Sequence, residues 1–243
     1  MTYRLVGRAA PVSTVLAAAL VASLSLIGGD AGAQTPAVYE RAPMAQYRMA
    51  SAADEIALAR SAAPASVSGE AEILVLGEHG YESAVEGKNG FVCLVERAWA
   101  SGLADPEFWN QHERAPICLN PPSVRSVLPN YLKRTQWVLA GASKDEVAAR
   151  TKAAVASGEI RAPDAGAMSY MMSKTGYLTD SDPHWHPHIM LFLPAMAPSD
   201  WGGNDHNNIV SGVASSNAPV TVFFIPVPRW SDGSLDTSMP MEN

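Results

Sequence analysis

The chain has 243 residues, of which 47% are hydrophobic and 17% charged, and its formal net charge is −7 at pH 7. A chain of this length and composition can bury a hydrophobic core and suits one globular domain. Its acidic balance, with no basic stripe interleaved with aromatic residues, excludes the phosphate-neutralising surface that nucleic-acid-binding proteins need, so we expect no nucleic acid partner.

The N-terminus has the pattern of a cleavable secretory signal peptide over residues 1–33. Arg4 and Arg8 precede an apolar stretch over 15–27, and small residues follow up to Ala33, where a signal peptidase would cleave. Because a transmembrane helix needs about 20 residues, this stretch is too short to span a bilayer, and we expect no membrane anchor after cleavage. Residues 34–243 would then form a single globular domain that is secreted or periplasmic.

The chain contains two cysteines, Cys93 and Cys118. In an oxidising compartment an even number of cysteines indicates pairing, so we predict a disulfide bond between them. The alternative is a pair of buried, inert thiols. A catalytic cysteine needs an activating histidine, and nothing in the spacing indicates one.

The first half of the mature chain mixes helical and strand patterns. After an extended lead-in over 34–44, methionine and alanine at helical spacing predict a helix over 45–62. Short runs of branched residues predict strands at 72–77 and 91–95, with a short extra strand between them as an alternative. The proline-containing stretch 103–120 is typical of an irregular loop, which the disulfide would attach to the second strand.

Two helical segments follow. Residues 121–139 predict a helix that Pro129 kinks or splits. Residues 144–157 predict a second helix, because Ser143 can cap its first turn while Glu146 reaches back to the cap.

The C-terminal third predicts three core strands, at 167–173, 187–193 and 220–227, followed by a turn at Trp230–Gly233 and a polar, frayed tail over 231–243. Helices and strands in separate blocks favour the α+β class. We expect an antiparallel or mixed sheet, built largely from the C-terminal third plus the N-terminal strand pair, with two or three helices.

Three of the six histidines fall in one pentapeptide, His184-Trp185-His186-Pro187-His188. In extended backbone, residues two apart share a face and lie about 6.6 Å apart, so two neighbouring imidazoles can converge on one ion but all three cannot. A metal site would need a further ligand, for which His206 is the first candidate. The other candidates are His79, Asp180 and Asp182.

Zinc is the ion that such a set favours, because neutral imidazoles with an open position suit catalytic zinc and its bound hydroxide. Copper is an alternative that thioethers would support, from Met168, Met171, Met172 and Met190. Methionines on strands, however, more often fill gaps in the core.

The alternatives to a metal site are a metal-free cleft beside Trp185 and Trp201, and a purely structural role for the histidines. Asp180 and Asp182 fit a turn as well as a carboxylate pair, and Glu78-His79 fits a solvated loop as well as an acid–base pair. Serine-hydrolase, P-loop and dinucleotide-binding motifs are absent from the sequence. The sequence therefore predicts an exported metal-binding protein, with a metal-dependent hydrolase as its catalytic form, or else a non-catalytic domain that binds a small molecule or a protein.

Overall fold

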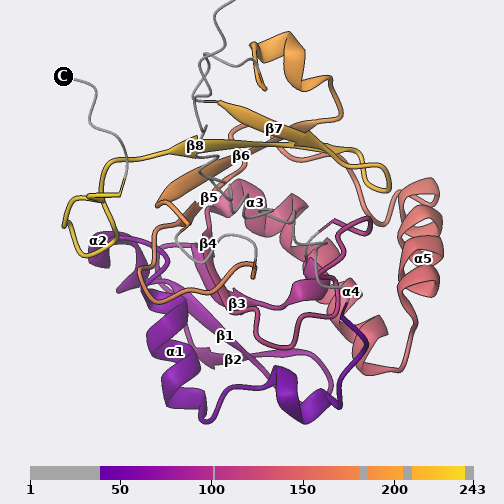
Figure 1. The fold of residues 1–243 in the computed structure, drawn as a ribbon, viewed down its shortest axis with the longest axis horizontal. Coiled ribbons are helices and arrows are strands. Elements are labelled where there is room, and N and C mark those ends of the chain that lie inside the picture. The colour runs from indigo at the N-terminus through magenta and orange to yellow at the C-terminus, as the bar shows by residue number, and fades with distance from the viewer. Residues whose placement is uncertain (1–38, 101, 181–184, 205–209, 239–243) are drawn as a thin grey trace, which may run out of the picture. The chain divides into compact units, whose positions relative to one another are not determined.

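The fold is built around a mixed sheet. In the computed structural model, which describes residues 39–100, 102–180, 185–204 and 210–238, eight strands form one sheet in the order β2-β1-β3-β4-β5-β6-β8-β7 (Figure 1). The strands are β1 (Glu72–Leu76), β2 (Tyr81–Val85), β3 (Val92–Glu96), β4 (Ala115–Leu119), β5 (Met168–Met171), β6 (His188–Pro194), β7 (Ser211–Ala214) and β8 (Val220–Pro226). The predicted signal peptide lies outside the described residues. The predicted α+β class is confirmed.

Five α-helices and three short 3₁₀ helices accompany the sheet in the described ranges. The α-helices are α1 (Ala52–Arg60), α2 (Ala65–Ser68), α3 (Pro121–Ser126), α4 (Leu128–Leu139) and α5 (Lys144–Ala156). The 3₁₀ helices are η1 (Met44–Tyr47), η2 (Ala98–Ala100) and η3 (Pro198–Trp201). No helix of these described segments is both long enough and apolar enough to cross a membrane.

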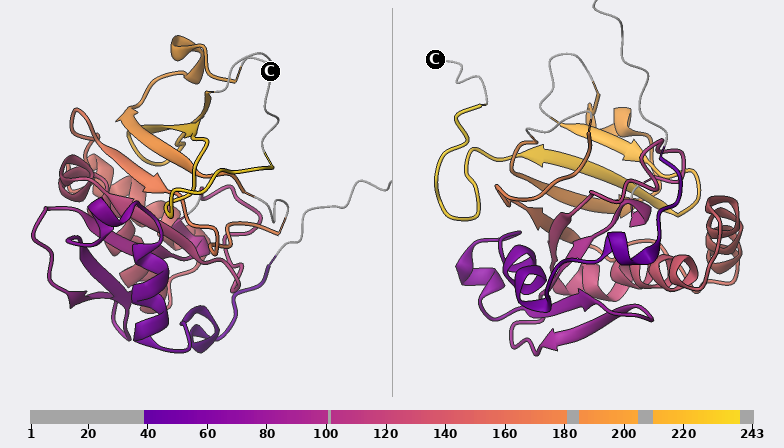
Figure 2. Two further views of the ribbon diagram at one scale, coloured as in Figure 1. Left: turned by 90° about the vertical axis from the view of Figure 1, so that its left-hand side faces the viewer. Right: turned by 60° about the horizontal axis from the view of Figure 1, so that its bottom comes forward.

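The central strands are buried on both faces, so their sequences are apolar without alternation. On one face, Cys93 and Val95 of β3 belong to the core that α1 covers. On the other, Leu94 and Ile117 belong to the core against which α3 and α4 pack. We call this second side the cavity face. Figure 2 shows β6, β7 and β8 at one end of the sheet and β1 and β2 at the other.

The predicted disulfide is confirmed. Cys93 and Cys118 lie directly opposite each other on the antiparallel strands β3 and β4, and their sulfur atoms are bonded. The expectation of an irregular loop up to residue 120 is wrong at its end, because 115–119 form β4. Proline has no N–H to donate to a neighbouring strand. Pro116 is tolerated in β4 because β5 pairs with β4 only from Cys118 onward, so no strand on the β5 side needs an N–H from residue 116.

The N-terminal strand pair is present, but its two strands are parallel neighbours. β2, which we considered only as an alternative, folds back on the outer side of β1, so β3 enters the sheet on the inner side and runs in the same direction as β1. β7 was not predicted, because Ser-Gly-Val-Ala carries a single branched residue.

The helices follow local capping rules. α1 begins later than predicted, at Ala52, because the side chain of Ser51 accepts a hydrogen bond from the Asp54 N–H. The predicted split at Pro129 is confirmed: α3 ends at Ser126 and Pro129 lies in the first turn of α4, where its missing N–H costs nothing. α5 begins with the predicted capping box.

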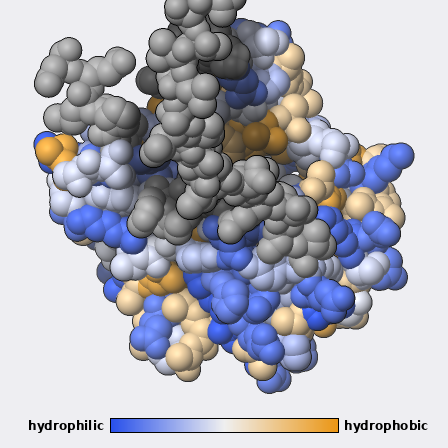
Figure 3. Space-filling model, in the orientation of Figure 1, coloured by the Kyte–Doolittle hydropathy of each residue, from blue (hydrophilic) through white to orange (hydrophobic). Residues whose placement is uncertain are grey.

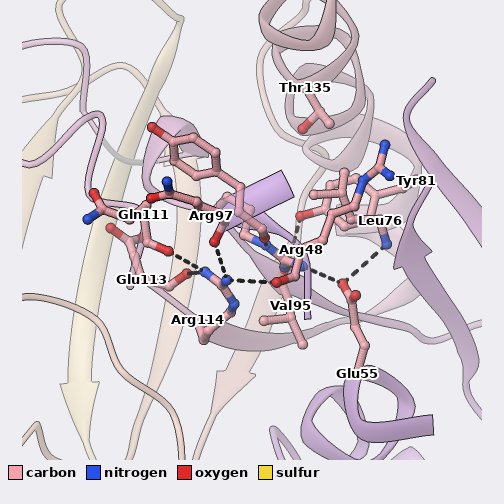
Figure 4. Close-up of polar contacts among 12 residues, drawn as sticks. Arg48, Glu55, Leu76, Tyr81, Val95, Arg97, Gln111, Glu113, Arg114 and Thr135 are labelled. Atoms are coloured by element: carbon pink, nitrogen blue, oxygen red, sulfur yellow. Dashed lines mark hydrogen bonds and ion pairs between the residues drawn. The ribbon is translucent and has the colours of Figure 1, made fainter. Parts of the chain in front are cut away.

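A buried arginine ties the N-terminal segment to the sheet (Figure 4). Arg97 is fully buried and donates hydrogen bonds to the carbonyl oxygens of Tyr47 (2.6 Å) and Val95, and to Oε1 of Glu55 (2.9 Å). The same Glu55 oxygen accepts from the N–H of Leu76 at 3.2 Å. The guanidinium charge is therefore paired and its donors are used, so this cluster stabilises the fold.

Candidate functional site

A cavity of about 760 Å³ lies between the cavity face of the sheet and the helices α3, α4 and α5. Its sheet side is apolar, because side chains that alternate along β5, β6 and β8 point into it: Met171, Met190, Phe192, Val222 and Phe224. Figure 3 shows strongly hydrophobic surface near the β6–β8 end of the sheet. The apolar volume is of the size that encloses a small organic molecule.

The helical side of the cavity is polar. Val127, Asn130, Tyr131 and Arg134, at the spacing i, i+3, i+4 and i+7, lie on one face of the α4 segment and line the cavity. Polar residues at this spacing are typical of a face exposed to water. Here Arg134 is only 6% exposed, so this polar face of α4 is turned inward.

Glu96, the last residue of β3, faces the same side of the cavity. Burial raises the pKa of its carboxyl group to about 8, although the nearby Arg134 charge and a hydrogen bond with Tyr131 both act to lower it. Burial also lowers the pKa of Arg134 to about 10, so its guanidinium remains charged at neutral pH. Arg134 donates to the carbonyl oxygen of Ala100 at 3.1 Å. This end of the cavity therefore combines a neutral carboxylic acid with a cation.

Trp185 and His188 form a second polar group at the β6 end of the cavity. The Nδ1 of His188 lies 2.9 Å from the carbonyl oxygen of His186 and donates to it, which leaves Nε2 as an acceptor. Burial lowers the pKa of His188, so the ring is neutral. Trp185 is 7% exposed and packs edge-on against the His188 ring, with ring centroids 5.5 Å apart.

His186 has a different partner from His188. Its Nδ1 lies 2.7 Å from Oδ2 of the buried Asp236, and Asp236 Oδ1 also accepts from the N–H and hydroxyl of Ser238. Asp236 and Ser238 belong to the tail over 231–243 that we expected to fray. The predicted Trp230–Gly233 turn is present, with the Gly233 N–H donating to the Trp230 carbonyl oxygen, and the hydrogen bonds of Asp236 hold the segment after it. Asp236 was missed because 50 residues separate it from His186.

The structure describes only some of the remaining predicted ligands. His184, His206 and Asp182 lie outside the described residues, so the complete metal set stays a prediction. Glu78 and His79 lie on an exposed loop, as the alternative reading proposed. Asp180 instead accepts hydrogen bonds from Asn110 and Tyr177.

In the part of the chain that the structure describes, no three His, Cys, Asp or Glu side chains cluster closely enough to hold a metal ion. Of the methionines considered for copper, Met171 and Met190 line the cavity. Trp201 is 46% exposed and stacks on Phe223. Because side chains alternate along a strand and Val222 and Phe224 face the cavity, Phe223 and Trp201 lie on the opposite side of the sheet.

Four side-chain atoms around the cavity are buried and have no hydrogen-bond partner within the described protein. They are Glu96 Oε1, Asn130 Oδ1, Trp185 Nε1 and His188 Nε2. Sequence reasoning singled out only Trp185 and His188 of these four. Comparisons of the chain with protein-family models, with curated proteins and with solved structures gave no match.

Proposed function

We propose that this chain is an exported protein that binds a small, largely apolar molecule in the cavity between the sheet and α4. The observation that carries the proposal is the set of four buried, unpartnered polar atoms. Buried polar groups in proteins are nearly always hydrogen-bonded, and each one left without a partner costs about 1 to 3 kcal/mol. A bound molecule that pairs them would offset this cost.

The shape and lining of the cavity support the same function. Small-molecule sites are concave, mostly apolar and carry a few polar groups that fix the orientation of the ligand. Here the apolar wall comes from β5, β6 and β8, and the polar groups stand at two ends, one on β3 and α4 and the other at the start of β6. Since β3 and β6 are three strands apart, these ends are separated by about 14 Å at the backbone.

The disulfide supports export, because such bonds persist in oxidising compartments. Together with the N-terminal sequence pattern, it favours a mature protein outside the cytoplasm. The mass of the protein recovered from the periplasm or the medium tests this: a mature chain that begins at Gln34 is expected, and an uncleaved chain retained in the cytoplasm would contradict it.

Binding can be tested with the fluorescent apolar probe N-phenyl-1-naphthylamine. The wild-type protein should bind the probe, and Val222→Trp should weaken binding because the indole projects into the cavity and occupies part of it. Ile225→Trp is the matched control, since Ile225 lies on the same strand and its side chain points to the opposite face. Weaker binding in both variants, or no binding by the wild type, would overturn the proposal.

A second candidate function is the predicted zinc site, using His186 with His184 or His188 and adding His206 as the further ligand. One observation favours it: His186 and His188 each direct Nδ1 to an acceptor, which is a carboxylate for His186 and a carbonyl oxygen for His188. Metal-bound histidines carry such outer partners, which orient the ring and leave Nε2 for the ion. Bound zinc would supply a hydroxide for hydrolysis.

Metal analysis of protein purified without a histidine tag, then incubated with zinc and desalted, tests this candidate. One zinc ion per chain is expected, and His186→Ala should lose it. Asp236→Asn should weaken zinc retention about tenfold or more through the orientation of the ring. A wild-type protein that retains no stoichiometric metal would rule the candidate out.

A further inference from the structure

The Trp185–His188 end of the cavity carries one donor and one acceptor on two packed rings. Trp185 Nε1 can only donate a hydrogen bond. His188 Nε2 can only accept one, because the other ring nitrogen already donates to the His186 carbonyl oxygen. Both atoms are buried and have no partner within the described protein. The ring centroids are 5.5 Å apart and the rings are nearly perpendicular, at 82°, so the two atoms belong to rings that are in direct contact.

The surroundings of this pair are apolar. His188 lies opposite Met171 of β5 and Pro226 of β8 in the sheet register. Its ring also packs against Phe224, with centroids 5.7 Å apart. A charged ligand group placed here would lose its hydration without gaining an opposite charge from these neighbours, which is costly.

Matching the two atoms restricts the chemistry of the ligand. A carboxylate accepts only, so it would meet the lone pair of His188 Nε2 without a proton between them. An ammonium group donates only, so it would leave the indole N–H unpaired, and an ether oxygen cannot donate to the imidazole. A hydroxyl group donates and accepts through one atom, so it satisfies both partners at once.

We propose that the Trp185–His188 pair is a subsite for an uncharged hydroxyl group, so that the natural ligand is an alcohol with an otherwise apolar body. This inference rests on the proposed binding function and specifies the ligand class. The hydroxyl hydrogen points to His188 Nε2 and the hydroxyl oxygen accepts from Trp185 Nε1. The apolar body lies along Met190 and Phe224.

Displacement of bound N-phenyl-1-naphthylamine by ligands with a common chain tests the subsite. The set comprises 1-decanol, its isomer methyl nonyl ether, decanoate and decylamine. Decanol should displace the probe at a concentration about tenfold lower than the ether, since a tenfold change corresponds to one well-placed hydrogen bond. Decanoate and decylamine should displace it less well than decanol.

Two variants and a control locate the effect. His188→Phe removes the acceptor that only the alcohol can use, so it should bind the probe yet reduce the preference for decanol over the ether to about twofold or less. Trp185→Phe removes a donor that the alcohol and the ether oxygen both use, so it should weaken both ligands and keep the preference. Phe224→Leu is the control, because it alters the apolar wall and should weaken decanol and the ether equally.

The outcomes separate this inference from the proposed function. If the wild type binds the probe but decanol and the ether displace it equally, the hydroxyl subsite is wrong and the binding cavity stands. Tighter binding of decanoate or decylamine than of decanol would also overturn the subsite, because it would assign a charged head group. If the wild type does not bind the probe, the cavity itself is not a binding site and both proposals fail.

Discussion

Replacing Glu96 with glutamine should make the protein more stable at neutral pH. The folded protein holds the Glu96 proton up to a pKa of about 8, because burial disfavours the carboxylate. In the unfolded chain a glutamate has a pKa of about 4.3. Between these two pKa values the unfolded chain has lost the proton and the folded protein still holds it. The free energy of unfolding is therefore highest below about pH 4.3, falls as the pH rises from there, and levels off above about pH 8.

The magnitude follows from proton linkage. One proton held only by the folded state changes the free energy of unfolding by about 1.4 kcal/mol per pH unit. Between pH 5 and pH 7 the wild type should therefore lose about 2 to 3 kcal/mol through this one residue. Glutamine has nearly the shape of the neutral acid and cannot ionise, so Glu96→Gln should remove that loss while keeping the contacts with Tyr131 and Arg134.

Urea unfolding of both proteins at pH 5, 6 and 7 measures the effect. The stability difference between Glu96→Gln and the wild type should grow with pH by about 1.4 kcal/mol per unit. Glu70→Gln, at an exposed position, serves as the control and should track the wild type at every pH. A difference that does not change with pH would refute the argument that burial keeps Glu96 protonated.

Three further changes test the scaffold by urea or thermal unfolding. Replacing Cys93 and Cys118 with alanine opens a loop of sequence separation 25, so we expect a loss of about 3 to 4 kcal/mol, and an unchanged urea midpoint would contradict it. Glu55→Ala leaves the fully buried Arg97 charge without its carboxylate, which should cost about 3 to 5 kcal/mol; a variant as stable as the wild type would show that the pair is dispensable. Ser143→Ala removes the α5 capping box and should lower the melting temperature by about 2 to 4 °C, whereas Ser66→Ala, at an exposed position, should leave it unchanged.

The parts of the fold that sequence could predict are those specified by local chemistry. The capping box at Ser143 and Glu146 marks the start of α5 within the sequence itself. The strand cores of β6 and β8 are compact apolar runs bounded by proline and asparagine or aspartate. The two cysteines predicted a bond whose partners turned out to be directly opposed.

The elements that sequence could not predict depend on neighbours far along the chain. β4 contains Pro116 and resembles a loop until its partners β3 and β5 are known. β7 is a short edge strand with weak strand propensity, and it exists because β8 offers a free edge. In both cases tertiary pairing overrides the local pattern.

The candidate site was only partly visible for the same reason. The histidine pentapeptide drew attention to Trp185 and His188, but as part of a metal set. Asn130 and Arg134 carry a helical spacing that ordinarily indicates a water-facing stripe, so nothing local shows that it faces a cavity. Glu96 closes an apolar strand, and only its burial beside α4 distinguishes it from a surface glutamate.

Glu96 and Arg97 show how a structural buried charge can be told from a functional one. Glu96 is the last residue of β3 and Arg97 follows it directly, and their side chains lie on opposite sides of the sheet, Arg97 beside Glu55 of α1 and Glu96 beside the cavity. Arg97 is paired with Glu55 and with backbone carbonyls, which accounts for its presence by the fold alone. Glu96 keeps an unpartnered oxygen beside the cavity, which the fold alone does not account for. The same comparison separates His186, paired with Asp236, from His188, whose Nε2 is unpartnered, and it favours His188 as the histidine that contacts an organic ligand.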